Sequence, residues 1–87
     1  MPPRRQREAR SPEHAALGEA IRERRAERGL SQEALADAAG VHVTHLGGVE
    51  RGTRNPNYTT IVKLARALGV TPGALVTRAD ELRRATR

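Results

Sequence analysis

Two histidines, His42 and His45, come closest in this sequence to a reactive or metal-binding pair. On a helix, residues three apart lie on one side, so both imidazoles could reach the same metal ion. The sequence contains no cysteine, and no nearby carboxylate completes the four ligands of a zinc site. We therefore expect neither a bound metal nor another cofactor.

The residue patterns of catalysis are also missing. We find no nucleophile beside a base, no carboxylate dyad and no phosphate-binding loop, and Gly47-Gly48 lacks the flanking pattern of a nucleotide site. The remaining histidine, His14, is expected on the surface, in the first turn of a helix. The sequence thus favours a binding protein over an enzyme.

Arginine is the residue type that points to a ligand. The formal net charge is +6, and it is unevenly distributed: residues 1–10 carry +3, residues 11–50 carry −3 and residues 51–87 carry +6. A basic balance of this kind indicates a polyanionic partner such as nucleic acid. The arm Arg4-Arg5-Gln6-Arg7 could enter a DNA minor groove or could be a solvated tail, and the sequence leaves both readings open.

Five short helices are predicted to position these charges. Capping residues mark the starts, with Ser11-Pro12 before the first helix, Ser31 before the second, Asn57 before the fourth and Thr71-Pro72 before the fifth. Glycines mark the ends, at Gly29, Gly40, Gly52 and Gly69. The predicted fold class is all-α, a compact five-helix domain without strands.

The chain has room for one domain. We expect a disordered basic arm over residues 1–10, the folded domain over residues 11–78 and a helical tail over residues 79–87. No apolar run of about 18 residues is present, which excludes a membrane span, and no apolar run follows the basic N-terminus, which excludes a secretory signal. With no cysteine, a cytoplasmic, nucleoid-associated location is expected.

The segment Ser31–Gly52 has the pattern of a helix-turn-helix. The small residue Ala36 lets the next helix cross closely, and Gly40 supplies a turn that needs a positive φ. Val41, Leu46 and Val49 then hold the second helix of the motif against the first, so that its other face is free for a DNA major groove.

These residues resemble the Cro and phage-repressor family of DNA-binding domains, over residues 15–76. The resemblance rests on GLSQEALA (29–36), Gly40, VERGTRNP (49–56) and KLARALGV (63–70). It implies a repressor-like five-helix fold and a transcriptional regulator that binds a two-fold duplex-DNA operator as a homodimer, with the third helix in the major groove. In size the chain is similar to phage-type repressors and to restriction-modification controller proteins.

The resemblance also implies a support for the third helix and contacts to the DNA backbone. Arg25 and Glu50 match an arginine and a glutamate that pair between the first and third helices, and Arg25 lies one turn beyond Ile21 on the apolar side of its helix. Gln32 matches a position that bonds a phosphate and buttresses the recognition helix. The expected phosphate contacts are Gln32, Arg51, Arg54 and Asn55.

Base contacts are expected from the third helix. Val43 and Thr44 match positions that reach base edges, and His45 could flank them. Gly48 departs from the family pattern, because phage repressors carry a base-reading side chain there. Since Thr44, Gly47, Gly48 and Arg51 fall on one stripe, we expect bare helix backbone to approach the groove at Gly48.

A second apolar stripe, on the last predicted helix, is expected to form a dimer interface in part; its residues are Leu75, Val76, Ala79 and Leu82. The alternative function is an antitoxin-type interaction protein, whose helix-turn-helix serves autoregulation while residues 77–87 hold a toxin. The operator, the regulated genes and the sign of regulation cannot be predicted from the sequence.

Overall fold

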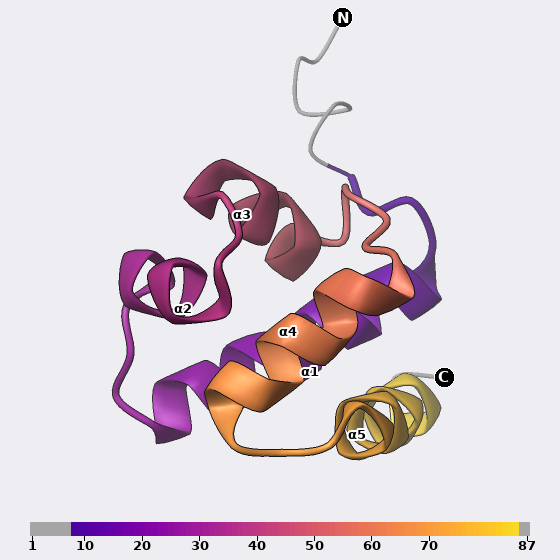
Figure 1. The fold of residues 1–87 in the computed structure, drawn as a ribbon. Coiled ribbons are helices and arrows are strands. Elements are labelled where there is room, and N and C mark those ends of the chain that lie inside the picture. Colours follow the sequence, from indigo (N-terminus) through magenta and orange to yellow (C-terminus); the bar gives the residue numbers. More distant parts are fainter. Residues whose placement is uncertain (1–7, 86–87) are drawn as a thin grey trace, which may run out of the picture.

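The computed structural model describes residues 8–85, which form five helices and no strand (Figure 1). The helices are α1 (Pro12–Glu27), α2 (Gln32–Ala39), α3 (Val43–Arg51), α4 (Tyr58–Leu68) and α5 (Pro72–Ala85). This confirms the predicted all-α fold class. None of the described helices is long and apolar enough to cross a bilayer.

Side-chain caps fix where most helices begin. Ser11 Oγ accepts a hydrogen bond from the backbone N–H of His14 at 3.1 Å, and Ser31 Oγ accepts one from Ala34 at 3.0 Å. Asn57 Oδ1 does the same for Thr60 at 2.8 Å. These bonds satisfy amides that have no partner inside the helix. The start of α3 is different, because its N-cap residue His42 makes no such bond.

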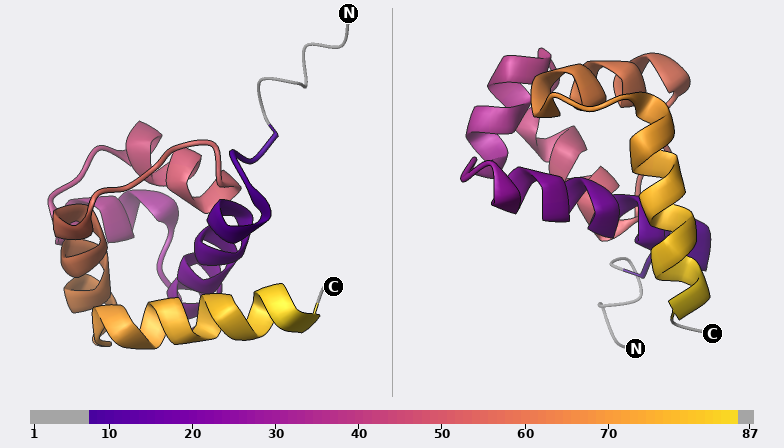
Figure 2. Two further views of the ribbon diagram at one scale, coloured as in Figure 1. Left: turned by 90° about the vertical axis from the view of Figure 1, so that its right-hand side faces the viewer. Right: turned by 90° about the horizontal axis from the view of Figure 1, so that it is seen from below.

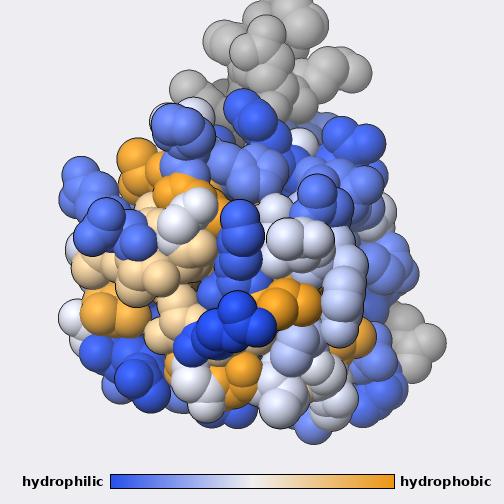
Figure 3. Space-filling view, in the orientation of Figure 1, coloured by the Kyte–Doolittle hydropathy of each residue, from blue (hydrophilic) through white to orange (hydrophobic). Residues whose placement is uncertain are grey.

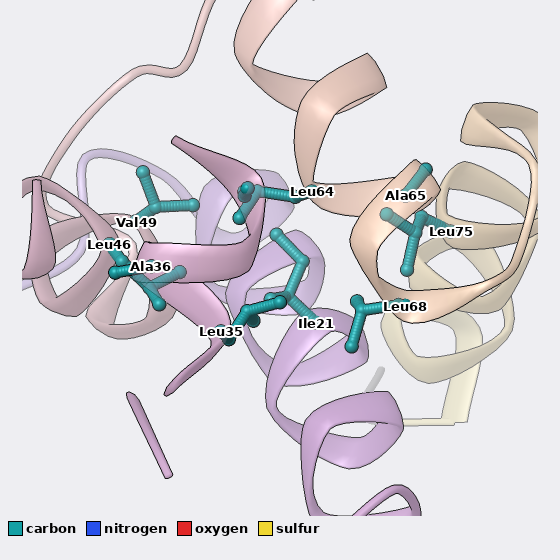
Figure 4. Close-up of a cluster of buried hydrophobic side chains, with 10 residues drawn as sticks. Ile21, Leu35, Ala36, Leu46, Val49, Leu64, Ala65, Leu68 and Leu75 are labelled. Carbon is teal, nitrogen blue, oxygen red and sulfur yellow. The ribbon is translucent and has the colours of Figure 1, made fainter. Parts of the chain in front are cut away.

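The turn between α2 and α3 has the geometry that a helix-turn-helix needs. Gly40 adopts a left-handed conformation with φ 71° and ends α2. Ala36 on α2 is buried, and Leu46 and Val49 of α3 are fully buried against the rest of the core (Figure 4). The apolar side of α3 therefore faces the protein, and its opposite side faces outward.

Leucine and isoleucine side chains from all five helices fill one core. Ile21, Leu35, Leu46, Leu64 and Leu75 are each 0% exposed and meet in a single cluster (Figure 4). Burying each such side chain contributes about 1.5–3 kcal/mol to stability. This cluster fixes the orientation of α3, because it packs α3 against α1 and α2.

Gly18 allows α1 to approach the end of α3 closely. A Cβ atom at this position would collide with the backbone carbonyl oxygens of Val49 and Glu50. Arg22, one turn later on α1, donates a hydrogen bond from Nη1 to the same Glu50 carbonyl at 3.4 Å. The C-terminal half of α3 is thus packed against the backbone of α1.

The last helix, α5, crosses α1 and packs against it (Figure 2). Ala79 lies with Ala16 and Ala20 in a small buried cluster, and Leu82 packs against it. Leu75 and Ala79 are only 0% and 8% exposed, so the chain's own core occupies half of the stripe expected to face a second subunit. The structure corrects that expectation for these two residues and leaves Val76, 47% exposed, on the surface.

The expected domain boundaries also differ from the structure. The helix α5 continues without a break past residue 78, so its described part belongs to the same folded unit as the rest of the domain. At the other end, Arg10 is not a free tail residue, because its backbone N–H donates to Gly52 O at 2.8 Å. Residues 1–7, with most of the basic arm, lie outside the described residues.

Candidate nucleic-acid interface

The outward face of α3 begins with two exposed side chains. Val43 is 39% exposed and Thr44 is exposed, whereas the neighbouring His45 is half-buried. These are the three residues expected to reach base edges from side chains. The structure places them together in the first turn of α3, where Thr44 lies opposite the buried Leu46 and Val49 and its neighbours Val43 and His45 lie on either side of it.

A buried carboxylate supports α3 from behind. Glu50 is 2% exposed and pairs with Arg25, whose Nε lies 2.7 Å from Oε2 and whose Nη2 lies 3.1 Å from Oε1. Gln32 Nε2 donates a further bond to Glu50 Oε1 at 2.8 Å. One acidic group of α3 is therefore tied to α1 and to the first residue of α2.

The same bonds leave Gln32 able to reach a ligand. Its amide nitrogen carries two hydrogens, and Glu50 accepts one of them. The second hydrogen remains available to a phosphate oxygen beside α3. The buttressing contact of Gln32 is thus present in the structure, and its phosphate contact stays a prediction.

Two arginine side chains cover the glycines at the middle of α3. A Cβ at Gly47 would lie 3.1 Å from Arg51 Nη1, and a Cβ at Gly48 would lie 3.3 Å from both Cβ and Cδ of Arg54 and still closer to its Cγ. Both glycines are buried. Gly48 is therefore not bare helix backbone, which corrects the expectation that a base edge meets it directly.

The loop after α3 is fixed by bonds to one carbonyl. The backbone N–H groups of Thr53 and Arg54 donate to Gly48 O at 2.9 and 3.2 Å, and Thr53 Oγ1 donates to it at 3.2 Å. These bonds hold the start of the loop against the last turn of α3. Arg54 is exposed beyond this point.

Asn55, expected to meet the DNA backbone, is linked to α1 by His14. His14 Nε2 lies 3.2 Å from Asn55 Oδ1, and His14 Nδ1 lies 2.7 Å from Ser11 Oγ. Both contacts are satisfied when Ser11 donates to Nδ1 and Nε2–H donates to Asn55. Since Oδ1 is then occupied, the Asn55 Nδ2 group stays available as a donor. No spacing rule in the sequence indicates this contact between residues 41 positions apart.

The N-terminal segment joins the same surface. Ala9 packs on Gly52, where a Cβ would lie 2.9 Å from the Ala9 Cβ, and Arg10 donates its backbone N–H to the Gly52 carbonyl. Exposed arginines at positions 10, 51 and 54 therefore gather around the end of α3. In Figure 3 the upper part of the molecule, over this region, is mostly hydrophilic.

No cluster of three His, Cys, Asp or Glu side chains able to hold a metal ion occurs within residues 8–85. The outward face of α3 and the loop after it therefore offer hydroxyl, amide and guanidinium groups. Such donors suit phosphate and base-edge acceptors.

Comparison with known proteins agrees with this arrangement. The helix-turn-helix family HTH_3 matches residues 21–75. The chain is 44% identical over 63 residues to the HTH-type transcriptional regulator y4dJ of Sinorhizobium fredii, covering 72% of this chain and 82% of that protein. It is 44% identical over 62 residues to control protein C.SmaI of Serratia marcescens, covering 71% and 74%.

A solved structure is similar over the same region. The restriction-modification controller protein C.AhdI from Aeromonas hydrophila is 45% identical, with a TM-score of 0.70, and the match covers 71% of this chain and 94% of that one.

Proposed function

This chain belongs to the HTH_3 family of helix-turn-helix DNA-binding regulators, and we propose that it binds a two-fold duplex operator as a homodimer with α3 in the major groove. The observation that carries this proposal is the way in which α3 is held against the rest of the domain. Its inner side is fixed by the Arg25–Glu50–Gln32 bonds, and its outer side presents Val43 and Thr44. A rigidly held helix with polar and methyl groups outward suits direct readout of base edges.

Base contacts in this proposal come from the first turn of α3. The Thr44 hydroxyl can bond to several base edges, and its methyl group and Val43 suit the C5-methyl of thymine. His45 is half-buried, so it serves at the flank of this site.

Phosphate contacts come from groups that surround α3. The free Gln32 amide hydrogen, the Asn55 Nδ2 group and the Arg51 guanidinium all lie next to the recognition helix or on it. Contacts of this kind position a protein on DNA without reading the sequence. The arm Arg4-Arg5-Gln6-Arg7 lies outside the described residues, and its contact with DNA stays a prediction.

Homodimer formation would use the exposed part of α5. Val76 is the large apolar side chain that this helix leaves exposed, and the half-buried Pro72 lies one turn earlier on the same side of the helix. Two copies related by a two-fold axis would then place their α3 helices about 34 Å apart, one turn of B-DNA.

The antitoxin alternative finds less support. It requires a segment free to hold a partner, whereas the described residues after 77 lie on α5 and pack against α1. No described contact favours it over the operator-binding function.

The proposal is tested by selecting duplexes from a random library with the full-length protein and measuring their binding by fluorescence anisotropy over a range of salt. We expect a two-fold consensus and a log–log salt slope of about −0.9 per phosphate contacted. Failure to enrich any sequence would overturn the proposal.

A further inference from the structure

Arg54 occupies the place where residue 48 lacks a side chain. Its Cγ would collide with the Cβ of any larger residue at position 48, and its Cβ and Cδ each lie 3.3 Å from where that Cβ would be. The stem of Arg54 thus packs on α3 at Gly48, and Arg54 as a whole is exposed. In effect the loop supplies the side chain that the helix does not have.

The loop bonds make this placement reproducible. Gly48 O accepts the backbone N–H of Arg54 itself at 3.2 Å and that of Thr53 at 2.9 Å. The residue that gives space to the arginine stem therefore also anchors its backbone. Such fixing lowers the entropy lost when the side chain binds a ligand.

The Arg54 guanidinium is available to a ligand. Within residues 8–85 it makes no hydrogen bond or ion pair, unlike Arg25, whose guanidinium is committed to Glu50 and to the Leu30 carbonyl at 3.0 Å. An exposed guanidinium with its stem packed and its five N–H donors free is suited to a planar acceptor pair.

Its position is on the face proposed to enter the major groove. Position 48 lies four residues after Thr44, one helical turn along the same side of α3. A group that leaves α3 at position 48 therefore meets base edges if Thr44 does. A phosphate-binding side chain would leave the helix nearer to its flanks.

We propose that Arg54, whose stem packs on Gly48, reads one guanine in each half-site. Its guanidinium would bind the O6 and N7 acceptors on the major-groove edge of that guanine. Arginine binds this pair of atoms with two parallel hydrogen bonds. Arg54 is then a specificity-determining residue, instead of the phosphate contact expected from the sequence. The inference rests on the operator-binding function proposed above, and it deepens that function by assigning one base.

Two substitutions test the inference on full-length protein with the selected operator. Arg54→Lys keeps the positive charge and removes the two-bond geometry. Gly48→Ala keeps Arg54 but fills the space that its stem occupies at position 48. Because alanine is a better helix former than glycine, this substitution does not weaken the helix itself. The matched controls are Arg66→Lys, in the last turn of α4, and Gly73→Ala, where a Cβ meets only Thr71 Oγ1 at 3.9 Å.

The expected result is loss of preference at one guanine per half-site in both variants. Operator affinity falls about 5- to 150-fold, while affinity for random DNA and the salt slope stay as in the wild type. The two variants combined lose no more than either alone. Replacing that guanine by 7-deazaguanine, which lacks N7, weakens the wild type and leaves Arg54→Lys unaffected. Both control proteins keep the full base preference.

Other results would overturn the inference in distinguishable ways. If Arg54→Ala leaves every base preference intact and weakens operator and random DNA equally, then Arg54 contacts phosphate and only this inference fails. If the wild-type protein selects no sequence at all, the proposed function fails together with it.

Discussion

The guanidinium of Arg25 and the carboxylate of Glu50 meet side-on, with Nε 2.7 Å from Oε2 and Nη2 3.1 Å from Oε1. Glu50 is almost fully buried, and a third bond from Gln32 completes its partners. A buried carboxylate is costly unless its oxygens are paired in this way. The pair therefore fixes how α3 packs against α1, and with it the face of α3 that points outward.

Removing one member of this pair should destabilise the protein strongly. We expect Arg25→Ala to lower the free energy of unfolding by about 3–5 kcal/mol, because the Glu50 charge stays buried without its partner. Its neighbour Arg24 makes an exposed pair with Glu27, so Arg24→Ala should cost less than about 1 kcal/mol. Urea unfolding followed by circular dichroism measures both. Equal losses in the two variants would contradict the buried-pair assignment.

Gly18 is expected to resist substitution although it lies inside a helix. Alanine there gains about 1 kcal/mol of helix propensity, but its Cβ collides with two carbonyl oxygens of α3. Overpacking of this kind typically costs about 1–3 kcal/mol, so Gly18→Ala should destabilise the fold. Gly73→Ala, in the open first turn of α5, should leave stability unchanged or raise it. Thermal unfolding compares them, and a Gly18→Ala protein more stable than wild type would show that α1 and α3 can separate freely.

Local rules predicted much of this fold. Ser11, Ser31 and Asn57 each cap the helix that the sequence assigned to them, and Gly40 adopts the left-handed turn conformation. These features depend on residues within one turn of each other, which a sequence pattern records directly. The helix-turn-helix followed from the same local signals.

Contacts across the fold were harder to predict. The stripe on α5 has the period of a buried face, but a period does not tell whether the chain's own α1 or a second subunit covers it. In the same way, the missing side chain at Gly48 looked like open backbone, because Arg54 comes from the following loop and not from the helix itself. The link from His14 to Asn55 joins the first turn of α1 to the loop after α3, which only the tertiary structure brings together.

The ion pair between α1 and α5 gives a pH-dependent contribution to stability. The hydrogen bond from Arg78, with Nε 2.8 Å from Glu23 Oε1, holds the pKa of that carboxyl below its usual value. A lowered pKa in the folded state means that the stabilisation is complete above the ordinary glutamate range and is lost as the pH falls through the folded-state value. Since both side chains are more than one-third exposed, solvent screens the pair and its contribution to stability is small.

The wild type should therefore be more stable than Glu23→Gln at neutral pH, and this difference in unfolding free energy should shrink as the pH falls. The difference between the wild type and Arg78→Gln should shrink in the same way. Urea unfolding midpoints measured from neutral to strongly acidic pH provide the comparison. A wild-type advantage that stays constant over the whole range would mean that the Glu23 charge does not contribute.

Dimer formation through α5 is tested at Val76. We expect Val76→Asp to weaken self-association and operator binding, while the unfolding midpoint stays close to that of the wild type, because the side chain is already largely exposed. Leu82→Asp would not separate a loss of self-association from a loss of folding stability, since Leu82 packs against Ala16, Ala20 and Ala79. The matched control is Thr77→Asp, which adds the same charge at the adjacent exposed position. Sedimentation velocity with and without operator DNA gives the assembly state. A wild-type monomer that binds a single half-site with full affinity would refute the homodimer.

The first turn of α3 gives the most direct test of base readout. Thr44 is exposed on the outer face of the helix, and its side chain offers one hydroxyl and one methyl group to the groove. Thr44→Ala removes both the hydroxyl and the methyl group and leaves the buried face of α3, with Leu46 and Val49, untouched. We expect it to relax the preference at one or two base pairs and to cost about 1–3 kcal/mol on the operator, with little change on random DNA. Thr59→Ala, an exposed threonine in the first turn of α4, is the matched control. A saturation binding profile of the operator measures every position in each variant. If Thr44→Ala keeps all base preferences of the wild type, α3 does not read the DNA through this face.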